Sequence, residues 1–168
     1  DGGLIALAGL SGGYGLVNLV TGMPVSTPRW GVRDSSGPPS FSPDGRVIVA
    51  PHRIGITEVW DAATLQKVHA WRGFLQAGSR SAAYSSDGRR LALGNGGFEA
   101  IKLWDAGTYD ELLTLEAEGS IYWITAFSPT GDYLGTLGAS KILHLWRAPS
   151  WAEIAAAEKS QSSKTRNP

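Results

Sequence analysis

The segment Phe41-Ser42-Pro43-Asp44-Gly45 decides the fold, because close copies of it return at a fixed distance along the chain. The copies read YSSDG at 84–88 and FSPTG at 127–131, and Asp1-Gly2 matches the last two residues of the segment. The fourth residue of this turn therefore stands at positions 1, 44, 87 and 130, always 43 residues apart. A constant spacing of this size is typical of proteins built from repeated supersecondary units.

Two further markers keep the same phase. Trp-Asp occurs at 60–61 and 104–105 and is followed by Trp-Arg at 146–147, at intervals of 44 and 42 residues. An apolar residue follows each turn at the same distance, and these residues are Ile5, Ile48, Leu91 and Leu134. Three markers that stay in phase over the whole chain indicate an internal repeat.

Each repeat has the pattern of short strands joined by turns. Apolar runs such as 47–50 and 91–93 are bounded by Gly, Asp, Asn and Pro, which favours strands over helices. In the repeated turn, Pro presets φ and Gly accepts a positive φ. Glycine clusters mark a second turn, and Thr64 and Thr108 mark a third. Three turns per repeat predict a four-stranded antiparallel sheet, which must stack on neighbouring sheets to bury its apolar faces.

Composition narrows the function classes. Lys and Arg together number 15, as do Asp and Glu, so the zero net charge lacks the signature of nucleic-acid or anionic-membrane binding. The chain has no Cys, which excludes disulfides, thiolate metal sites and a Cys nucleophile. The glycine-rich segments lack the Lys-Ser/Thr of a phosphate-binding loop, and the three His have no metal-ligand spacing. We therefore expect no cofactor, no metal, no nucleic acid, no membrane and no catalysis by these residues.

With these motifs the chain resembles the WD40-repeat β-propeller family over residues 1–149. The resemblance implies an all-β, WD40-type β-propeller of about four four-stranded antiparallel blades. Family members often carry a His that joins an Asp, a Ser or Thr and the blade Trp in a buried hydrogen-bond network. The positions that would hold this His are Val32, Leu75 and Glu118. We therefore expect apolar packing to hold these blades together.

The two ends of the chain favour a group of C-terminal blades from a larger propeller over a closed four-bladed ring. The first repeat begins inside its Asp-Gly turn. After the last Trp-Arg, an S-x-x-E capping box at 150–153 and an Ala run predict a short helix at 150–159. We expect a disordered tail at 160–168. A terminal blade with a bare apolar face would be prone to self-association.

The resemblance implies a noncatalytic scaffold that binds a protein or peptide through loops at one face of the propeller. The loops that lead into the first strand of each blade hold aromatic and Arg side chains, the types favoured in binding hot spots. These candidate contact residues are Trp30, Arg33, Trp71, Phe74, Arg80 and Tyr122. The alternative for the aromatic residues is a place in the packing between blades. Trp123 lies within an expected strand and is assigned to the core.

A second hypothesis is a regulatory or targeting propeller at the C-terminus of a bacterial multidomain enzyme. The segment 145–151, with the Ala/Glu helix that follows it, is similar to the C-termini of bacterial multidomain proteins. Some of those proteins join a serine/threonine kinase domain to WD repeats. The sequence leaves the partner, the total number of blades and the compartment open, with the cytoplasm as the preferred compartment.

Overall fold

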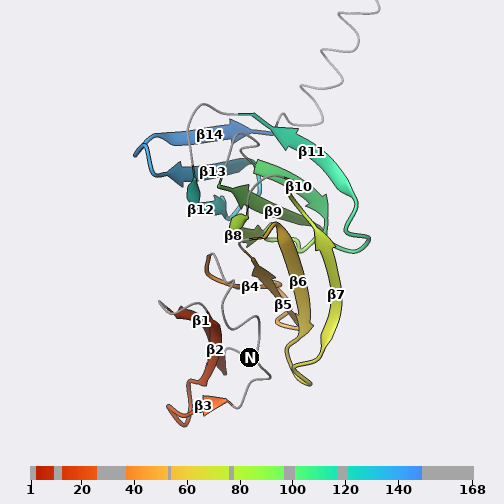
Figure 1. The fold of residues 1–168 in the computed structure, drawn as a ribbon, viewed down its shortest axis with the longest axis vertical. Coiled ribbons are helices and arrows are strands. Elements are labelled where there is room, and N and C mark those ends of the chain that lie inside the picture. Colours follow the sequence, from red (N-terminus) through yellow and green to blue (C-terminus); the bar gives the residue numbers. More distant parts are fainter. Residues whose placement is uncertain are drawn as a thin grey trace, which may run out of the picture.

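The computed structural model describes residues 3–9, 13–25, 37–52, 54–75, 78–96, 101–116 and 121–148. These residues are all-β and contain no helix, which confirms the predicted class of fold. The described strands form four antiparallel sheets of three or four strands each (Figure 1). The helix predicted at 150–159 and the tail at 160–168 lie outside the described residues.

Within each sheet the strands are neighbours in chain order, as a series of hairpins requires. Sheet 1 contains β1 (Leu4–Gly9), β2 (Gly13–Asn18) and β3 (Pro24–Val25). Sheet 2 contains β4 (Ser40–Phe41), β5 (Val47–Pro51), β6 (Ile56–Asp61) and β7 (Lys67–Arg72). Sheet 3 contains β8 (Ser79–Tyr84), β9 (Arg90–Asn95), β10 (Ile101–Asp105) and β11 (Glu111–Leu115). Sheet 4 contains β12 (Tyr122–Phe127), β13 (Tyr133–Gly138) and β14 (Leu143–Arg147).

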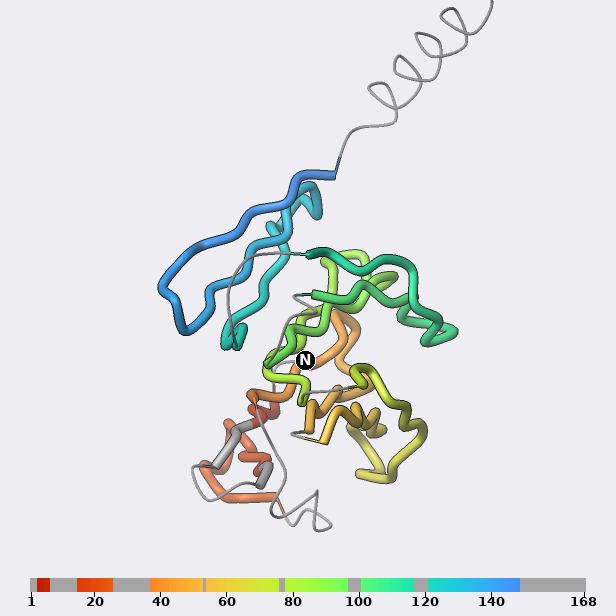
Figure 2. The backbone as a smooth tube through the Cα atoms, turned by 45° about the horizontal axis from the view of Figure 1, so that its top comes forward, coloured from red at the N-terminus to blue at the C-terminus, as the bar shows by residue number. Residues whose placement is uncertain are grey.

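The four sheets stand in a row that follows the chain, with sheet 1 (red) at one end and sheet 4 (blue) at the other (Figures 1 and 2). The first strands of sheets 2, 3 and 4, which are β4, β8 and β12, lie next to one another. The last strands β7 and β11 lie on the outside (Figure 1). Sheets 2, 3 and 4 therefore approach one another at their first strands and diverge toward their last strands.

The turn between the first and second strands is built in the same way in sheets 2 and 3. Ser42 Oγ donates to Asp44 Oδ1 at 2.6 Å, and the same Asp44 oxygen accepts the backbone N–H of Arg46 at 3.1 Å. Ser85 and Asp87 make the corresponding contact at 2.6 Å. The glycine that closes each turn has a positive φ, which glycine adopts without strain: 71° at Gly45, 71° at Gly88 and 80° at Gly131.

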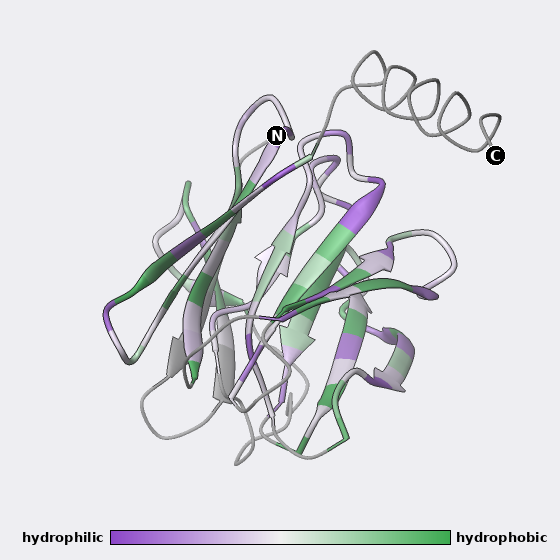
Figure 3. Ribbon diagram, turned by 90° about the horizontal axis from the view of Figure 1, so that it is seen from above, coloured by the Kyte–Doolittle hydropathy of each residue, from purple (hydrophilic) through white to green (hydrophobic). Residues whose placement is uncertain are grey.

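Apolar side chains fill the spaces between consecutive sheets. Hydrophobic residues occur along the strands, where the ribbon is green in Figure 3. Each fully buried side chain of this kind contributes about 1.5–3 kcal/mol to stability. Three clusters each join one sheet to the next. Their members include Leu16, Ile48 and Trp60 between sheets 1 and 2, Val49, Val59, Leu91 and Trp104 between sheets 2 and 3, and Ala92, Ile101, Tyr122 and Leu134 between sheets 3 and 4.

Hydrogen bonds between buried hydroxyl groups also join the sheets. Thr57 Oγ1 lies 3.2 Å from Ser79 Oγ, which connects β6 to β8. Ser81 Oγ lies 2.6 Å from Thr125 Oγ1, which connects β8 to β12. All four side chains are buried. The two hydroxyl pairs add to the apolar packing that the sequence leads us to expect, and each pair satisfies polar atoms inside an interface.

Candidate functional site

Arg80 and Trp123 occupy matching irregularities in neighbouring first strands. The pairing of β8 with β9 shifts register at Arg80, and the pairing of β12 with β13 shifts register at Trp123. Each is thus the extra residue of a β-bulge, which redirects a side chain from the regular alternation of its strand. The two bulges are 43 residues apart in the sequence.

The two bulged side chains contact each other. The guanidinium carbon of Arg80 lies 5.4 Å from the centre of the Trp123 ring, within the range of a cation–π attraction. Trp123 is 46% exposed and Arg80 is half-buried. The assignment of Trp123 to the core is therefore wrong, because the bulge places its ring at the surface. The pair presents an apolar ring and a cation side by side, and we call it the Arg80–Trp123 surface.

The backbone beside this surface is held by buried contacts. Ser81 Oγ donates to the Tyr122 carbonyl oxygen at 3.1 Å and lies 2.6 Å from Thr125 Oγ1. On the other side of β8, a methyl group at Gly37 would overlap the carbonyl of Arg80, so that glycine permits this close approach. The position of the pair is thus set before any partner arrives, which lowers the entropic cost of binding.

Phe74 and Tyr122 are placed in the core and not at a surface. Both are only 1% exposed, Phe74 in the cluster between sheets 2 and 3 and Tyr122 in the cluster between sheets 3 and 4. Trp30 and Arg33 lie outside the described residues. Of the six residues proposed from the sequence, the structure thus brings Arg80 together with an exposed aromatic ring, and that ring was not among the six.

Trp71 belongs to an aromatic cluster between the outer strand β7 of sheet 2 and the β10–β11 hairpin of sheet 3. Its ring centre lies 5.5 Å from that of Trp104 and 5.0 Å from that of Tyr109. His69 stacks on Tyr109 with ring centres 4.5 Å apart. Trp71 is half-buried, and its Nε1 is buried with no hydrogen-bond partner in the part of the chain that the structure describes. This cluster closes the outer edge of an interface, so packing accounts for Trp71.

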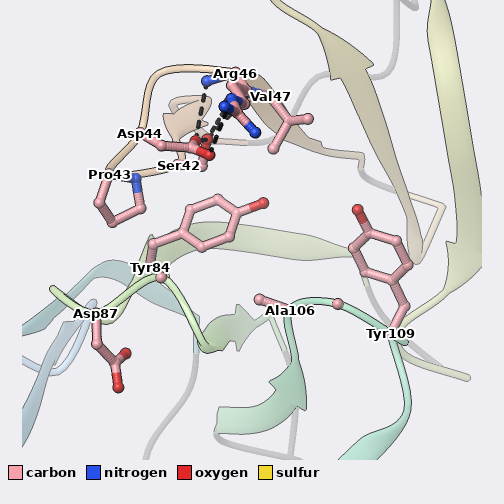
Figure 4. A pocket seen from close by; sticks show the side chains of 11 residues that line it. Ser42, Pro43, Asp44, Arg46, Val47, Tyr84, Asp87, Ala106 and Tyr109 are labelled. Carbon is pink, nitrogen blue, oxygen red and sulfur yellow. Dashed lines mark hydrogen bonds and ion pairs between the residues drawn. The ribbon is translucent and has the colours of Figure 1, made fainter.

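A hollow of about 460 Å³ lies at the other end of the strands, between the turns of sheets 2 and 3 (Figure 4). The hydrogen bond from Ser42 and that from the backbone of Arg46 lower the pKa of Asp44, and they commit its carboxylate to the turn. Burial raises the pKa of Tyr84, whose hydroxyl finds no hydrogen-bond partner among the described residues. The Tyr84 hydroxyl is thus buried, and the carboxylates of Asp44 and Asp87, which line the hollow, are both hydrogen-bonded within their own turns.

Glu58 on β6 binds the residue that follows β5, a second residue of β6 and the first residue of β7. Its Oε2 accepts hydrogen bonds from His52 Nε2 at 3.1 Å and from Trp60 Nε1 at 3.2 Å, and its Oε1 accepts one from Lys67 Nζ at 3.0 Å. The hydrogen bond from His52 and that from Lys67 favour the charged form and lower the pKa of Glu58 to about 2. These contacts fix the edge of sheet 2, so we assign Glu58 to stability.

Sheet 3 carries the corresponding ion pair with its charges exchanged. Lys102 stands two residues before Trp104, as Glu58 stands two before Trp60, and Lys102 Nζ lies 3.0 Å from Glu111 Oε2. A lysine has no acceptor to offer an indole N–H. The Nε1 of Trp104 is accordingly buried without a hydrogen-bond partner among the described residues.

Within the described ranges, no group of three or more His, Asp or Glu side chains is arranged to hold a metal ion. The same ranges include no helix with the length and apolar character needed to cross a membrane. No protein-family model matches the chain, and no curated protein matches it.

Proposed function

We propose that the chain forms blades of a WD40-type β-propeller and acts as a noncatalytic scaffold that binds a protein or peptide at the Arg80–Trp123 surface. Support for the propeller comes from four hairpin-built sheets in chain order, and the first strands of sheets 2, 3 and 4 lie side by side (Figure 1). The turns with matching hydrogen bonds at 42–46 and 85–89 add to it, because they stand 43 residues apart.

The exposed Trp123 ring beside Arg80 is the observation that carries the binding role. Trp and Arg are the residue types most enriched among those that dominate protein-binding energy. A partner that covered the ring would bury apolar area at about 25 cal/mol per Å². Because the backbone on both sides of the pair is already fixed, little of this gain would be lost to ordering.

The chemistry of the pair defines the ligand. The Trp123 ring offers an apolar contact, and the Arg80 guanidinium offers hydrogen bonds to a carboxylate or carbonyl. The partner is therefore a peptide segment that carries an apolar side chain next to an acidic one.

A peptide-display selection on the purified chain tests this function. Peptides recovered from a random library would be synthesised, and their affinities for the wild type, Trp123→Ala and Arg80→Ala measured by calorimetry. Loss of the ring is expected to weaken binding about tenfold or more, which corresponds to about 1.4 kcal/mol. Leu112→Ala is the matched control, because Leu112 is an exposed apolar residue on the outer strand β11. Peptides that bind Trp123→Ala as tightly as the wild type would refute the proposed site.

A further inference from the structure

The three interfaces between sheets are built from the same kinds of cross-strand pairs. Toward the preceding sheet, each sheet presents a pair that we call its leading pair: Ile48–Trp60 in sheet 2, Leu91–Trp104 in sheet 3 and Leu134–Trp146 in sheet 4. Toward the following sheet, each presents a trailing pair: Ala6–Leu16 in sheet 1, Val49–Val59 in sheet 2 and Ala92–Leu103 in sheet 3. In every interface of the row, a trailing pair packs on the next leading pair.

One pair at each end of the row has no such neighbour in the described part of the chain. The trailing pair of sheet 4 is Gly135–Leu145, and Leu145 is 63% exposed, whereas Val59 at the matching place in sheet 2 is 0% exposed. The leading pair of sheet 1 is Ile5–Val17, and Ile5 is 41% exposed, whereas Ile48 is 0% exposed. The two end faces thus correspond to the two halves of the interfaces within the row, with Val17 in the place that Trp holds in the other leading pairs.

The trailing face of sheet 4 is apolar well beyond this pair. The register of β12, β13 and β14 places on it five exposed large residues, which are Ile124, Tyr133, Leu137, Leu143 and Leu145. A Cβ at Gly135 would stand 3.2 Å from Leu145 Cδ2, so the leucine lies across the glycine. A continuous exposed face of this kind marks an interaction surface.

We propose that this face binds the leading face of sheet 1 in a second copy of the chain, so that the protein associates head to tail. The pattern of the row selects this occupant, because each trailing pair in it is covered by a leading pair that begins with Ile or Leu. Sheets 1 and 4 stand at opposite ends of the row (Figures 1 and 2), so the second copy supplies the face. Because the net charge of the chain is zero, two copies meet no overall electrostatic repulsion when they associate.

Head-to-tail contacts are heterologous, because the two surfaces that meet are different. They close into a ring when the rotation between copies permits, and otherwise they extend into a chain of copies. The proposal rests on the packing between sheets and not on the Arg80–Trp123 surface, so either can fail without the other.

Light scattering coupled to size-exclusion chromatography tests the association over a range of protein concentrations. The wild type is expected to elute with the mass of two or more copies. Leu145→Glu and Ile5→Glu should each give the mass of one chain, 17.8 kDa, because each places a carboxylate on one of the two apolar faces that meet in the interface. Leu112→Glu, at an exposed apolar residue of β11, should associate as the wild type does. Circular dichroism would verify that the variants fold, which their exposed positions favour.

Mixing the two single variants distinguishes a head-to-tail contact from a symmetric one. The Leu145→Glu copy keeps an intact leading face and the Ile5→Glu copy keeps an intact trailing face, so the mixture should form a species with the mass of two chains. A symmetric contact through sheet 4 would survive Ile5→Glu and would not be restored by mixing. The proposal is overturned by a wild type that stays at the mass of one chain at every concentration, by association that survives either substitution, or by a mixture that remains monomeric.

Discussion

The guanidinium carbon of Arg80 lies 5.4 Å from the centre of the Trp123 ring, although the two residues are 43 positions apart in the sequence. Both residues are the extra member of a bulge in the first strand of a sheet, and β8 and β12 lie side by side. The contact therefore requires a β-bulge at the same position in the first strands of sheets 3 and 4. We infer that the bulges serve the exposed pair, because regular strands would direct these side chains elsewhere.

Adjacent residues on β12 should respond very differently to truncation. Tyr122→Ala is expected to cost about 3–5 kcal/mol of unfolding free energy, because it empties a fully buried site. Trp123→Ala should cost less than about 1 kcal/mol, because its ring is at the surface. Urea unfolding of the two variants measures the difference. Equal losses of unfolding free energy in the two variants would mean that Trp123 is part of the core.

Gly37→Ala should destabilise the protein by about 1–3 kcal/mol, because the added methyl group overlaps the Arg80 carbonyl and forces the backbone ahead of β4 away from β8. Gly15→Ala is the matched control, since a Cβ there meets nothing within 4 Å. That change should be neutral or stabilising by up to about 1 kcal/mol. Thermal unfolding of both variants provides the test, and two equal midpoints would show that β8 does not approach Gly37 this closely.

Stability should fall in acid partly through Glu58. Its pKa is about 2 in the folded protein against an ordinary value of 4.5, so its contribution is complete above pH 4.5 and is lost as the pH falls toward 2. In Glu58→Gln, this part of the pH dependence should disappear. Urea unfolding at a series of pH values measures it for both proteins. Parallel curves for the two proteins over that interval would mean that Glu58 is not held in its charged form by His52 and Lys67.

Exchanging the ion pair of sheet 3 should stabilise the protein. In Lys102→Glu combined with Glu111→Lys, the new carboxylate can accept the Trp104 Nε1–H, as Glu58 accepts that of Trp60. One added hydrogen bond to a buried donor is expected to contribute about 1 kcal/mol. Lys102→Glu alone should be less stable than the double variant, because it leaves two carboxylates facing each other. A double variant no more stable than the wild type in urea would exclude this acceptor.

The strands and the buried apolar residues that follow the repeated turn could be predicted from the sequence because local chemistry determines them, whereas Phe74 and Tyr122 are buried against the prediction of a contact role. The repeated turn needs a glycine with a positive φ, and Gly45, Gly88 and Gly131 have one. An apolar residue three positions after each of these glycines packs toward the preceding sheet, as Ile48 and Leu91 do, and both are fully buried. The arrangement of the sheets as a propeller remains part of our proposal.

The candidate site was only half predicted, and the reason is physical. A bulge is a change of backbone register that no particular residue type predicts. The sequence therefore assigns Trp123 to the core, because it lies inside an expected strand. The available signal was the repeat itself, because Trp123 stands one repeat length after Arg80. The exchanged ion pair was missed for a related reason, since Glu58 and Lys102 have opposite charges at corresponding places.

Backbone chemical-shift mapping would locate the peptide-binding site and so test our proposal that a peptide partner binds at the Arg80–Trp123 surface. A selected peptide would be titrated into the isotopically labelled chain. The largest shifts are expected at 78–81 and 121–124, around the two bulges, and they should vanish in Trp123→Ala. Shifts concentrated instead at 42–46 and 106–109, around the hollow between the turns, would contradict the proposal.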